Sequence, residues 1–389
     1  MTTEPLIPLA VPDLSGREEE YLRACIASTF VSTVGPFVPR FEEQVAAAIG
    51  SRGAVATCSG TAGLHVALTA LGVGQNDLVV LPSLTFIASA NAIAQCGAQP
   101  WLFDVTQESW TLDPELLERR LAADTERRPE GLFHRPSGRR IAAVMPVHTL
   151  GLPADMHAIV PVARRYGLPV VADSAAALGA TCRGKPPGAL GADLSVLSFN
   201  GNKTVTAGAG GAVVGDDPEL LALVRHLSST ARVGQDYDHD RPGFNYRMTN
   251  LQAAVGCAQM ERWESLVAAK RRIRHRYDQA FAGLEGVEPF PAPPWVEGAC
   301  WFSGIVLRSP TWEGREAVLR SRLRELGIDS RPFWKPVHLQ APYRNAPCTE
   351  MPVCEELWLR VLTLPCSAGL TDAEQDRVIA ALLQAFQST

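Results

Sequence analysis

Lys203 is the residue whose surroundings most strongly suggest chemistry. It lies in the stretch SVLSFNGNKTVTAGAGGAVVG (195–215), which contains no other charged residue. The apolar runs LSVLSF (194–199) and GGAVVG (210–215) on either side of it predict two short buried strands. An ammonium between two interior strands is unfavourable unless the protein uses it. The position of Lys203 therefore predicts a functional lysine.

Three more features with chemical potential follow predicted strands. The stretch CSGTAG (58–63) leads from a strand into a helix, and free amides at a helix N-terminus with nearby hydroxyls favour an anion such as phosphate. Phe86 comes just after the next strand, where its ring could stack on a flat ligand. Asp173 ends an all-apolar strand and needs a cationic or hydrogen-bonding partner there. Taken singly, each has an ordinary explanation: a helix N-cap for 58–63 and for Asp173, and a core position for Phe86.

One ligand would use all of these features together, namely pyridoxal phosphate. Lys203 would form a Schiff base with its aldehyde, and Asp173 would keep its pyridine nitrogen protonated so that the ring acts as an electron sink. Phe86 would cover the ring, while the helix start at 58–63 and its hydroxyls would take the phosphate. The four features, in this order on one chain, predict a pyridoxal-phosphate enzyme.

Other motif classes do not fit the sequence. GNKT (201–204) is not a Walker A loop, because its glycine and lysine are not adjacent and no glycine precedes them at the required offset. GAGG (208–211) lies between strands and opens no helix, so it is not a dinucleotide fingerprint. The histidines lack zinc-type spacing, so no metal is expected, and His148 and His157 are expected to be structural or to contact substrate.

The elements that must position these residues alternate between strand and helix. The expected strands are 54–59, 77–83, 99–105, 141–147, 169–174, 194–199 and 210–215, and the expected helices are 61–72, 85–97, 113–123 and 154–167. Such alternation predicts an α/β fold with right-handed crossovers and a mostly parallel sheet. Ligands gather at the carboxyl ends of such strands, where the residues above lie. Helices are also expected at 17–28 and 37–49, and a polar loop at 127–140.

The remainder of the chain predicts a smaller α+β domain. It follows a long helical tract at 248–285, and the run PAPPW (291–295) marks a change of composition. Its expected elements are a strand at 300–309, a helix at 315–327, a strand at 328–334 and a helix at 372–386. We therefore expect a large cofactor-binding domain at 1–250, and a connecting helix with a small domain at 251–389.

The composition is that of an ordinary soluble protein. The 389 residues are 46% hydrophobic and 20% charged, and the formal net charge of −5 gives no basic field for nucleic acid or anionic membranes. The basic cluster KRRIRHR (270–276) is expected to be a solvated helix face. Nine scattered cysteines without a C-x-x-C motif favour free thiols in a reducing compartment. Without a signal peptide or a long apolar window, a cytoplasmic location is expected.

The chain also resembles, over nearly its whole length, the DegT/StrS family of nucleotide-sugar aminotransferases. The matching motifs are GPFVPRFE (35–42), SGTAGLHVALTALGV (59–73), LPSLTFIASANAI (81–93), MPVHTLGLPADM (145–156), SFNGNKTVTAGAGGAVV (198–214), GFNYRMTNLQAAVGCAQME (243–261), RPFWKPVHLQAPY (331–343) and RVLTLPCSAGLTDAE (360–374). The resemblance implies the aspartate-aminotransferase-like fold, called fold type I. It also implies a homodimer with active sites at the subunit interface.

The resemblance implies roles for individual residues. For the cofactor, Lys203 matches the Schiff-base lysine, Asp173 the partner of the pyridine nitrogen, Phe86 the stacked aromatic, and Gly60, Thr61 and Ser198 the phosphate ligands. Asn245 matches the asparagine that reaches the phosphate from the neighbouring subunit. Substrate contacts are expected from His338, Arg247 and His148.

Two positions depart from the family pattern. Ala176 stands where Gln or Glu usually lies near the phenolic oxygen of the cofactor, and TAGAGG (206–211) replaces TTGEGG or TTGGGG. Lys203 is kept, whereas relatives that deoxygenate sugars have histidine there. The resemblance therefore implies an aminotransferase that converts a nucleotide-linked keto-deoxysugar, with a 4-keto group, to the amino sugar using glutamate. A non-catalytic relative that binds cofactor or sugar nucleotide, and a dehydratase of the same fold, remain alternatives.

Overall fold

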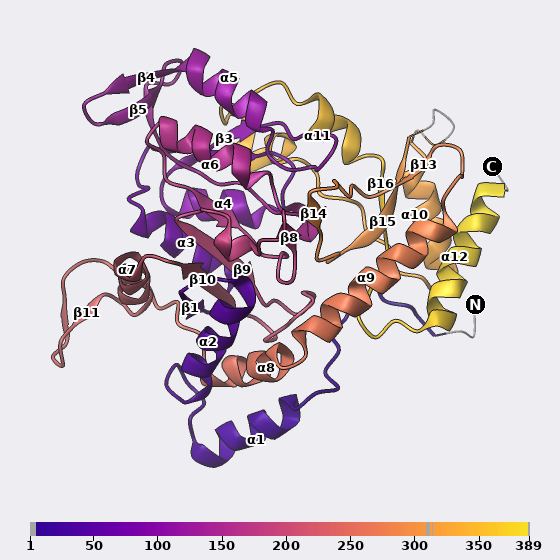
Figure 1. Ribbon diagram of the computed structural model, residues 1–389, viewed down its shortest axis with the longest axis horizontal. Coiled ribbons are helices and arrows are strands. Elements are labelled where there is room, and N and C mark those ends of the chain that lie inside the picture. Colours follow the sequence, from indigo (N-terminus) through magenta and orange to yellow (C-terminus); the bar gives the residue numbers. More distant parts are fainter. Residues whose placement is uncertain (1–4, 309–311, 313, 388–389) are drawn as a thin grey trace.

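The computed structural model describes residues 5–308, 312 and 314–387 (Figure 1). At its centre, strands lie in the order β1 (Gly53–Thr57), β10 (Gly211–Gly215), β9 (Leu194–Ser198), β7 (Val171–Asp173), β6 (Arg139–Val144), β2 (Leu78–Pro82) and β3 (Gln99–Phe103). Isolated parallel bridges from Val144 to Val170 and from Val147 to Asp173 join β6 to β7. The β7–β9, β2–β6 and β2–β3 pairs are parallel, whereas β10 runs antiparallel to both neighbours. The predicted mostly parallel sheet is confirmed.

Helices follow the strands as the alternation predicts. They are α3 (Gly60–Ala70), α4 (Ala88–Gln95), α5 (Pro114–Asp124) and α6 (Met156–Arg165), preceded by α1 (Glu18–Ser28) and α2 (Phe37–Ile49). A further helix, α7 (Pro218–Ser228), follows β10 and was not predicted. Local sequence sets several of their starts. Asp113 and Asp217 each cap a helix whose first residue is proline, and each carboxylate accepts two backbone N–H groups of the first turn.

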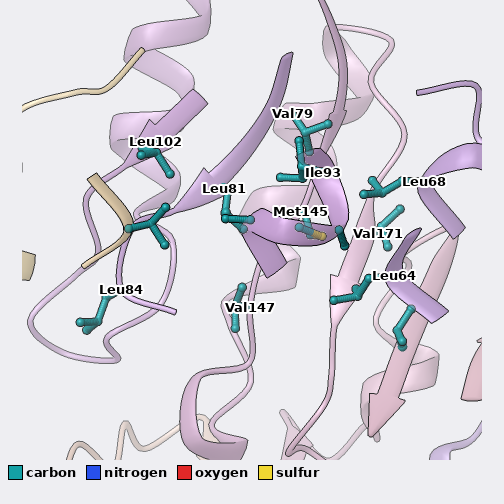
Figure 2. Packing of buried hydrophobic residues seen from close by; sticks show 14 of the residues in the cluster. Leu64, Leu68, Val79, Leu81, Leu84, Ile93, Leu102, Met145, Val147 and Val171 are labelled. Carbon is teal, nitrogen blue, oxygen red and sulfur yellow. The ribbon is translucent and has the colours of Figure 1, made fainter. Parts of the chain in front are cut away.

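The sheet is covered on both faces because its strand residues alternate in direction. In β2, Val79 and Leu81 pack with side chains of α3 and α4 in one buried cluster (Figure 2). Leu78 and Val80 pack on the other side with residues of α5 and α6. Successive strand residues point to opposite faces, so an all-apolar strand is stable only between two helical layers. Each such side chain contributes about 1.5–3 kcal/mol to folding.

The polar loop expected at 127–140 is wrong. The structure has a hairpin there, of β4 (Thr125–Arg128) and β5 (Gly131–His134), which pairs antiparallel with β6 at the edge of the sheet. Gly131, with φ of 138°, makes the backbone turn that only glycine adopts without strain. The charged residues that suggested a loop belong to an edge strand, where charge prevents pairing with other chains.

The C-terminal part contains its own antiparallel sheet, which lies to the right of the central sheet in Figure 1. The long helical tract is divided into α8 (Asn250–Met260) and α9 (Trp263–Ala280). The sheet has the order β13 (Val287–Pro289), β15 (Ser303–Leu307) and β16 (Val361–Leu364), and it packs with α10 (Glu316–Glu325) and α12 (Asp372–Gln387). The remaining short elements are β8 (Thr181–Cys182), β11 (Arg232–Val233), β12 (Asp238–His239), β14 (Val296–Glu297) and α11 (Pro352–Leu357).

The predictions for this part hold unevenly. The helices at 315–327 and 372–386 are confirmed, and the strand at 300–309 is found as β15, although Ser309 lies outside the described residues. The strand at 328–334 is wrong, because this segment makes only isolated bridges from Ile328 and Pro332. The domain limits 1–250 and 251–389 stay a prediction.

The basic cluster at 270–276 is not a solvated face throughout. Lys270 and Arg274 point into the protein and are 3% and 8% exposed. Lys270 donates to backbone carbonyls, and the Arg274 Nε donates to Asp278, with Oδ1 at 2.7 Å. These partners replace the water that the cations lose on burial. Here the expectation of a solvated surface was wrong.

Several expected absences can be examined in the described part of the chain. No helix there is long and apolar enough to cross a lipid bilayer. No three His, Cys, Asp or Glu side chains there are grouped so as to hold a metal ion. All nine cysteines lie in the described ranges and are free thiols, as predicted.

Candidate active site

A cleft of about 340 Å³ opens beyond the carboxyl ends of β7 and β9, next to the start of α3. Seven of the predicted site residues line it: Gly60, Thr61, Phe86, His148, Asp173, Ser198 and Lys203. They lie at or after the carboxyl ends of β1, β2, β6, β7 and β9, which the sheet brings to one edge. The residues singled out from the sequence are therefore neighbours in space.

Lys203 lies in the connection between β9 and β10, as the sequence predicts. Its backbone N–H donates to the Asn200 carbonyl at 2.9 Å, and Phe199 and Gly210 close the base of the loop with a 2.9 Å bond. Burial lowers the pKa of Lys203 to about 7, against the smaller opposing effect of the Asp173 carboxylate. Much of the lysine is thus a neutral nucleophile at neutral pH, unlike a solvated lysine.

Asp173 is held by two hydrogen bonds at the end of β7. Its Oδ2 accepts from the Ser89 hydroxyl at 2.7 Å, and its Oδ1 accepts from the Ala175 N–H at 3.0 Å. Burial raises the pKa of Asp173, while these bonds and Lys203 act to lower it. No helix begins after Asp173, so the N-cap explanation is wrong. The sequence did not reveal Ser89, because a serine inside a helix has no distinctive signal.

The start of α3 and Ser198 form the small, polar end of the cleft. Ser59 caps the helix, and its Oγ accepts from the Ala62 N–H at 3.1 Å. A Cβ atom on Gly60 would lie 2.9 Å from the Ser198 Cβ, so only glycine allows this close approach. The N-cap explanation is therefore correct for Ser59. The first backbone amides of α3 and the Thr61 hydroxyl lie beside the cleft, where they could bind an anion.

Aromatic rings line another part of the cleft. The Phe86 side chain is 56% exposed, so it is not a core residue, and its ring centroid lies 6.2 Å from that of Trp334. Trp301 stacks on Phe302 with ring centroids 4.1 Å apart. Lys203 Nζ lies 3.4 Å from the centroid of the Trp301 ring. Trp301, Phe302 and Trp334 were not predicted, because only the packing of the C-terminal part brings them to the cleft.

His148 offers the cleft an unpaired polar atom. Its Nδ1 accepts from the Ala154 N–H at 3.1 Å, which places the proton of the neutral ring on Nε2. Nε2 is buried without a hydrogen-bond partner in the described structure. Burial lowers the pKa of His148 to about 4, so the ring is neutral at physiological pH. The backbone N–H of His148 donates to the Asp173 carbonyl at 2.9 Å, which ties its position to β7.

Three predicted site residues lie outside the Lys203 cleft. Asn245 and Arg247 line a separate hollow, where Arg247 donates to the Thr33 carbonyl at 2.6 Å. His338 lies between the Ser83 hydroxyl, 2.7 Å from its Nδ1, and Glu355, 3.2 Å from its Nε2. None of the three lines the Lys203 cleft. Their predicted roles are not explained by a site built from one chain.

The cleft fits pyridoxal phosphate by the chemistry of its donors. The amides at the start of α3 and the Ser198 hydroxyl suit the phosphate, the Asp173 carboxylate suits a protonated ring nitrogen, and the Lys203 amine suits the aldehyde. Ala176, at the departure from the family pattern, also lines the cleft and brings no hydrogen-bonding side chain there. When bound, the cofactor supplies an electron sink for breaking a bond at an amine-bearing carbon.

Comparison with known proteins agrees with this chemistry. Residues 12–383 match the DegT/DnrJ/EryC1/StrS aminotransferase family. The chain is 39% identical over 391 residues to the GDP-perosamine synthase of Caulobacter vibrioides, with 99% of both chains covered. It is 36% identical over 387 residues to EpsN of Bacillus subtilis, a proposed pyridoxal phosphate-dependent aminotransferase, with 98% of this chain and 96% of EpsN covered.

The structural comparison gives the same answer. The crystal structure of DesV from S. venezuelae superposes with a TM-score of 0.87 at 31% identity, covering 99% of both chains. The expected aspartate-aminotransferase-like fold of type I is confirmed. The chain therefore belongs to the DegT/DnrJ/EryC1/StrS aminotransferase family, and it is a pyridoxal-phosphate-dependent aminotransferase.

Proposed function

We propose that the protein transfers an amino group to the 4-keto carbon of a GDP-linked deoxysugar, with glutamate as the donor. The observation that carries the proposal is that Lys203 and Asp173 line one cleft together with the start of α3 and Ser198, whose amides and hydroxyls suit a phosphate. A relative named GDP-perosamine synthase, whose alignment covers 99% of this chain, supports a GDP-sugar substrate. The 4-keto position and glutamate come from the motif resemblance.

The side chains divide the work of this reaction. Lys203 is the base and acid at its Nζ, taking a proton from one carbon and returning it to another; burial suits it because its neutral form is abundant near pH 7. Asp173 holds the ring nitrogen protonated, and Ser89 keeps that carboxylate oriented. Phe86 excludes water from one face of the ring and fixes its plane.

A second hollow gives the nucleotide a place to lie. It has about 520 Å³ and shares Asn202, Phe302 and Trp334 with the Lys203 cleft, so the two are adjacent. Arg331 is the cation among its described lining residues, and its side chain is 67% exposed. We propose that the sugar enters the Lys203 cleft while the diphosphate and base extend toward Arg331.

The test is transamination with defined substrates. Glutamate alone should convert the protein-bound cofactor to its amine form, with loss of the absorbance of the lysine-bound form. A GDP-linked 4-keto-deoxysugar should then restore that absorbance and yield the amino sugar. UDP- and TDP-linked ketosugars serve as controls for the nucleotide. A cofactor unchanged by glutamate would support the non-catalytic alternative, and consumption of ketosugar without a donor would support the dehydratase.

We also propose that two chains share each active site. Asn245 and Arg247 lie outside the Lys203 cleft of their own chain. They follow the exposed hairpin of β11 and β12, which extends away from the body of the protein (Figure 1). A two-fold axis would bring this segment to the phosphate end of the partner's cleft, and would do so at both sites.

Mixing two inactive variants tests the sharing of sites. Lys203→Ala and the double variant Asn245→Ala with Arg247→Ala should each be inactive alone. A heterodimer of the two combines both defects in one site and leaves the other intact. After random reassembly of equal amounts, activity should return to about a quarter of the native value.

A matched pair provides the control. A mixture of Lys203→Ala and Asp173→Asn should not recover activity. Each chain supplies both Lys203 and Asp173 to the same site, so no heterodimer contains an intact site. If verified heterodimers of the first mixture stayed inactive, Asn245 and Arg247 would not act on the partner's site.

A further inference from the structure

Trp301 lies between the two lysines of the chain that are not exposed, the half-buried Lys203 and the buried Lys270. The sequence has four lysines, at 185, 203, 270 and 335. Lys185 and Lys335 are exposed, whereas Lys203 and Lys270 both contact Trp301. Lys203 Nζ faces the ring at 3.4 Å from its centroid, and Lys270 Nζ donates to the Trp301 backbone carbonyl at 3.0 Å. The reacting lysine and a second lysine are thus connected through one residue.

The Trp301 indole is fixed relative to the loop that carries Lys203. Its Nε1–H donates to the Asn202 carbonyl at 2.8 Å, one residue before the lysine. Its ring is 24° from parallel with that of Phe302, which supports its other side in the stacked pair. The Trp301 residue is 5% exposed, so the indole itself is shielded from water. The arrangement is a preformed cation–π contact.

Lys270 fixes the backbone from which that indole projects. It belongs to α9, is 3% exposed, and donates to the carbonyls of both Trp301 and Cys366. In the described structure, Lys270 donates to carbonyl oxygens and to the Cys366 sulfur, and it forms no ion pair with a carboxylate. A methionine would fill the same apolar space without desolvating a charge. What the ammonium adds is a directed link between α9, Trp301 and the end of β16.

We propose that Trp301 stabilises the protonated form of the Lys203 amine during its proton transfers, and that Lys270 is a positioning residue that acts on Lys203 through Trp301. The inference rests on the proposed function, which makes Lys203 the proton carrier. Nζ must hold a proton briefly between two carbons, and the indole face offers an attraction that costs no reorganisation at that moment.

The other titratable groups facing Lys203 are few. Among the residues that line the cleft they are Asp173 and His148. The carboxylate of Asp173 favours the ammonium, and His148 is neutral because its pKa is about 4. Burial acts in the opposite direction and dominates, which gives Lys203 its pKa of about 7. In the proposal, the Trp301 ring acts in the same direction as Asp173, against the effect of burial on the lysine pKa.

The experiment measures the ionisation of Lys203 in the full chain freed of cofactor. Acetylation by limiting acetic anhydride is followed from pH 5 to 11, and each of the four lysines is resolved by peptide mass spectrometry. Trp301→Phe and Trp301→Leu should lower the pKa of Lys203 progressively, by about one unit in the leucine variant. Lys270→Met should lower it in the same direction, and Lys270→Arg should restore it, because arginine also donates to carbonyls.

The sign of the change in the Lys203 pKa separates the proposed effect from a simple charge effect. Deleting the Lys270 charge alone would raise the pKa of Lys203, since it removes a cation. If Lys270 acts through Trp301, the lowering by Lys270→Met should disappear in the Trp301→Leu background. Lys185→Met, on the surface, is the control that should leave Lys203 unchanged. In the holoenzyme, the low-pH limb of the kcat profile should move with the Lys203 pKa.

Different outcomes would contradict different parts of the proposal. An unchanged or raised Lys203 pKa in Trp301→Leu would contradict the role of the indole, and Trp301→Phe gives the same test if the leucine variant fails to fold. An equal effect of Lys270→Met in both backgrounds would contradict action through Trp301. Failure of the proposed function would instead appear as a lack of transamination by the native protein, whatever the ionisation of Lys203.

Discussion

Replacing Lys203 with arginine is expected to abolish multiple turnover. Arginine keeps the positive charge in the connection between β9 and β10, but its guanidinium stays protonated and cannot take the covalent and proton-carrying roles of an amine. The loss should exceed about 10⁴-fold in kcat, since proton transfer by a positioned group and covalent attachment of the cofactor are both removed. The measurement is steady-state transamination with glutamate and the ketosugar.

The variants should fold and still bind the cofactor without a covalent bond. Lys203→Ala leaves the start of α3 and Asp173 untouched. In the described part of the structure the Lys203 amine makes no hydrogen bond that folding would lose, and its contact is with the Trp301 ring. Circular dichroism and cofactor retention after gel filtration check both points. Lys185→Arg, at an exposed lysine, is the control for a general effect of lysine replacement. Sustained turnover by Lys203→Arg would show that another residue is the reacting amine.

The parts of the site that the sequence predicted share one physical property. Lys203, Asp173 and the start of α3 stand directly at the ends of apolar strands, where a polar residue contrasts with its neighbours. The rules for parallel sheets then place all strand ends at one edge, so linear positions become spatial neighbours. Local pattern and topology together were sufficient for this half of the cleft.

The other half could not be found in the same way. Trp301 and Trp334 belong to the C-terminal part, and their approach to Lys203 depends on how that part packs across α9. No periodicity encodes such a long-range contact. The burial of Lys270 was not predicted for the same reason. A basic run on a helix predicts a solvent-exposed face, and only the carbonyls of Trp301 and Cys366 make the burial of Lys270 possible.

The fold errors arose where composition and tertiary context disagree. The segment 125–134 is polar, yet the first residues of β6, 139–141, are not paired by β7, so β5 pairs with them and the segment forms a hairpin. The segment 328–334 is apolar enough for a strand and lies beside β16, but Pro332 lacks the N–H that a ladder needs and the Arg331 N–H donates to the Thr363 side chain, so only the isolated bridge from Pro332 to Leu362 forms there. In the first case an available partner decided the structure, and in the second a missing donor did.

Asp173→Asn is expected to lower kcat by about 10³-fold or more and to weaken cofactor retention. Asparagine has nearly the same shape and can still hydrogen-bond a ring nitrogen, but it lacks the negative charge that keeps this nitrogen protonated. The Ser89 hydroxyl and the Ala175 N–H, which now donate to a carboxylate, would meet a neutral amide that accepts less strongly. Kinetics of each half-reaction and the dissociation constant of the cofactor measure the two effects.

Ser89→Ala separates charge from orientation. It removes one charge-assisted hydrogen bond to Asp173, worth about 1.5–3 kcal/mol, and leaves the carboxylate in place. Because that bond favours the ionised form, its loss raises the pKa of Asp173 further, so activity should fall first at the acid end of the pH profile. Asp173→Asn should instead be impaired at every pH, since it has no carboxylate to ionise. Near-native turnover by Asp173→Asn would mean that Asp173 only shapes the turn after β7 and that a different group holds the cofactor ring.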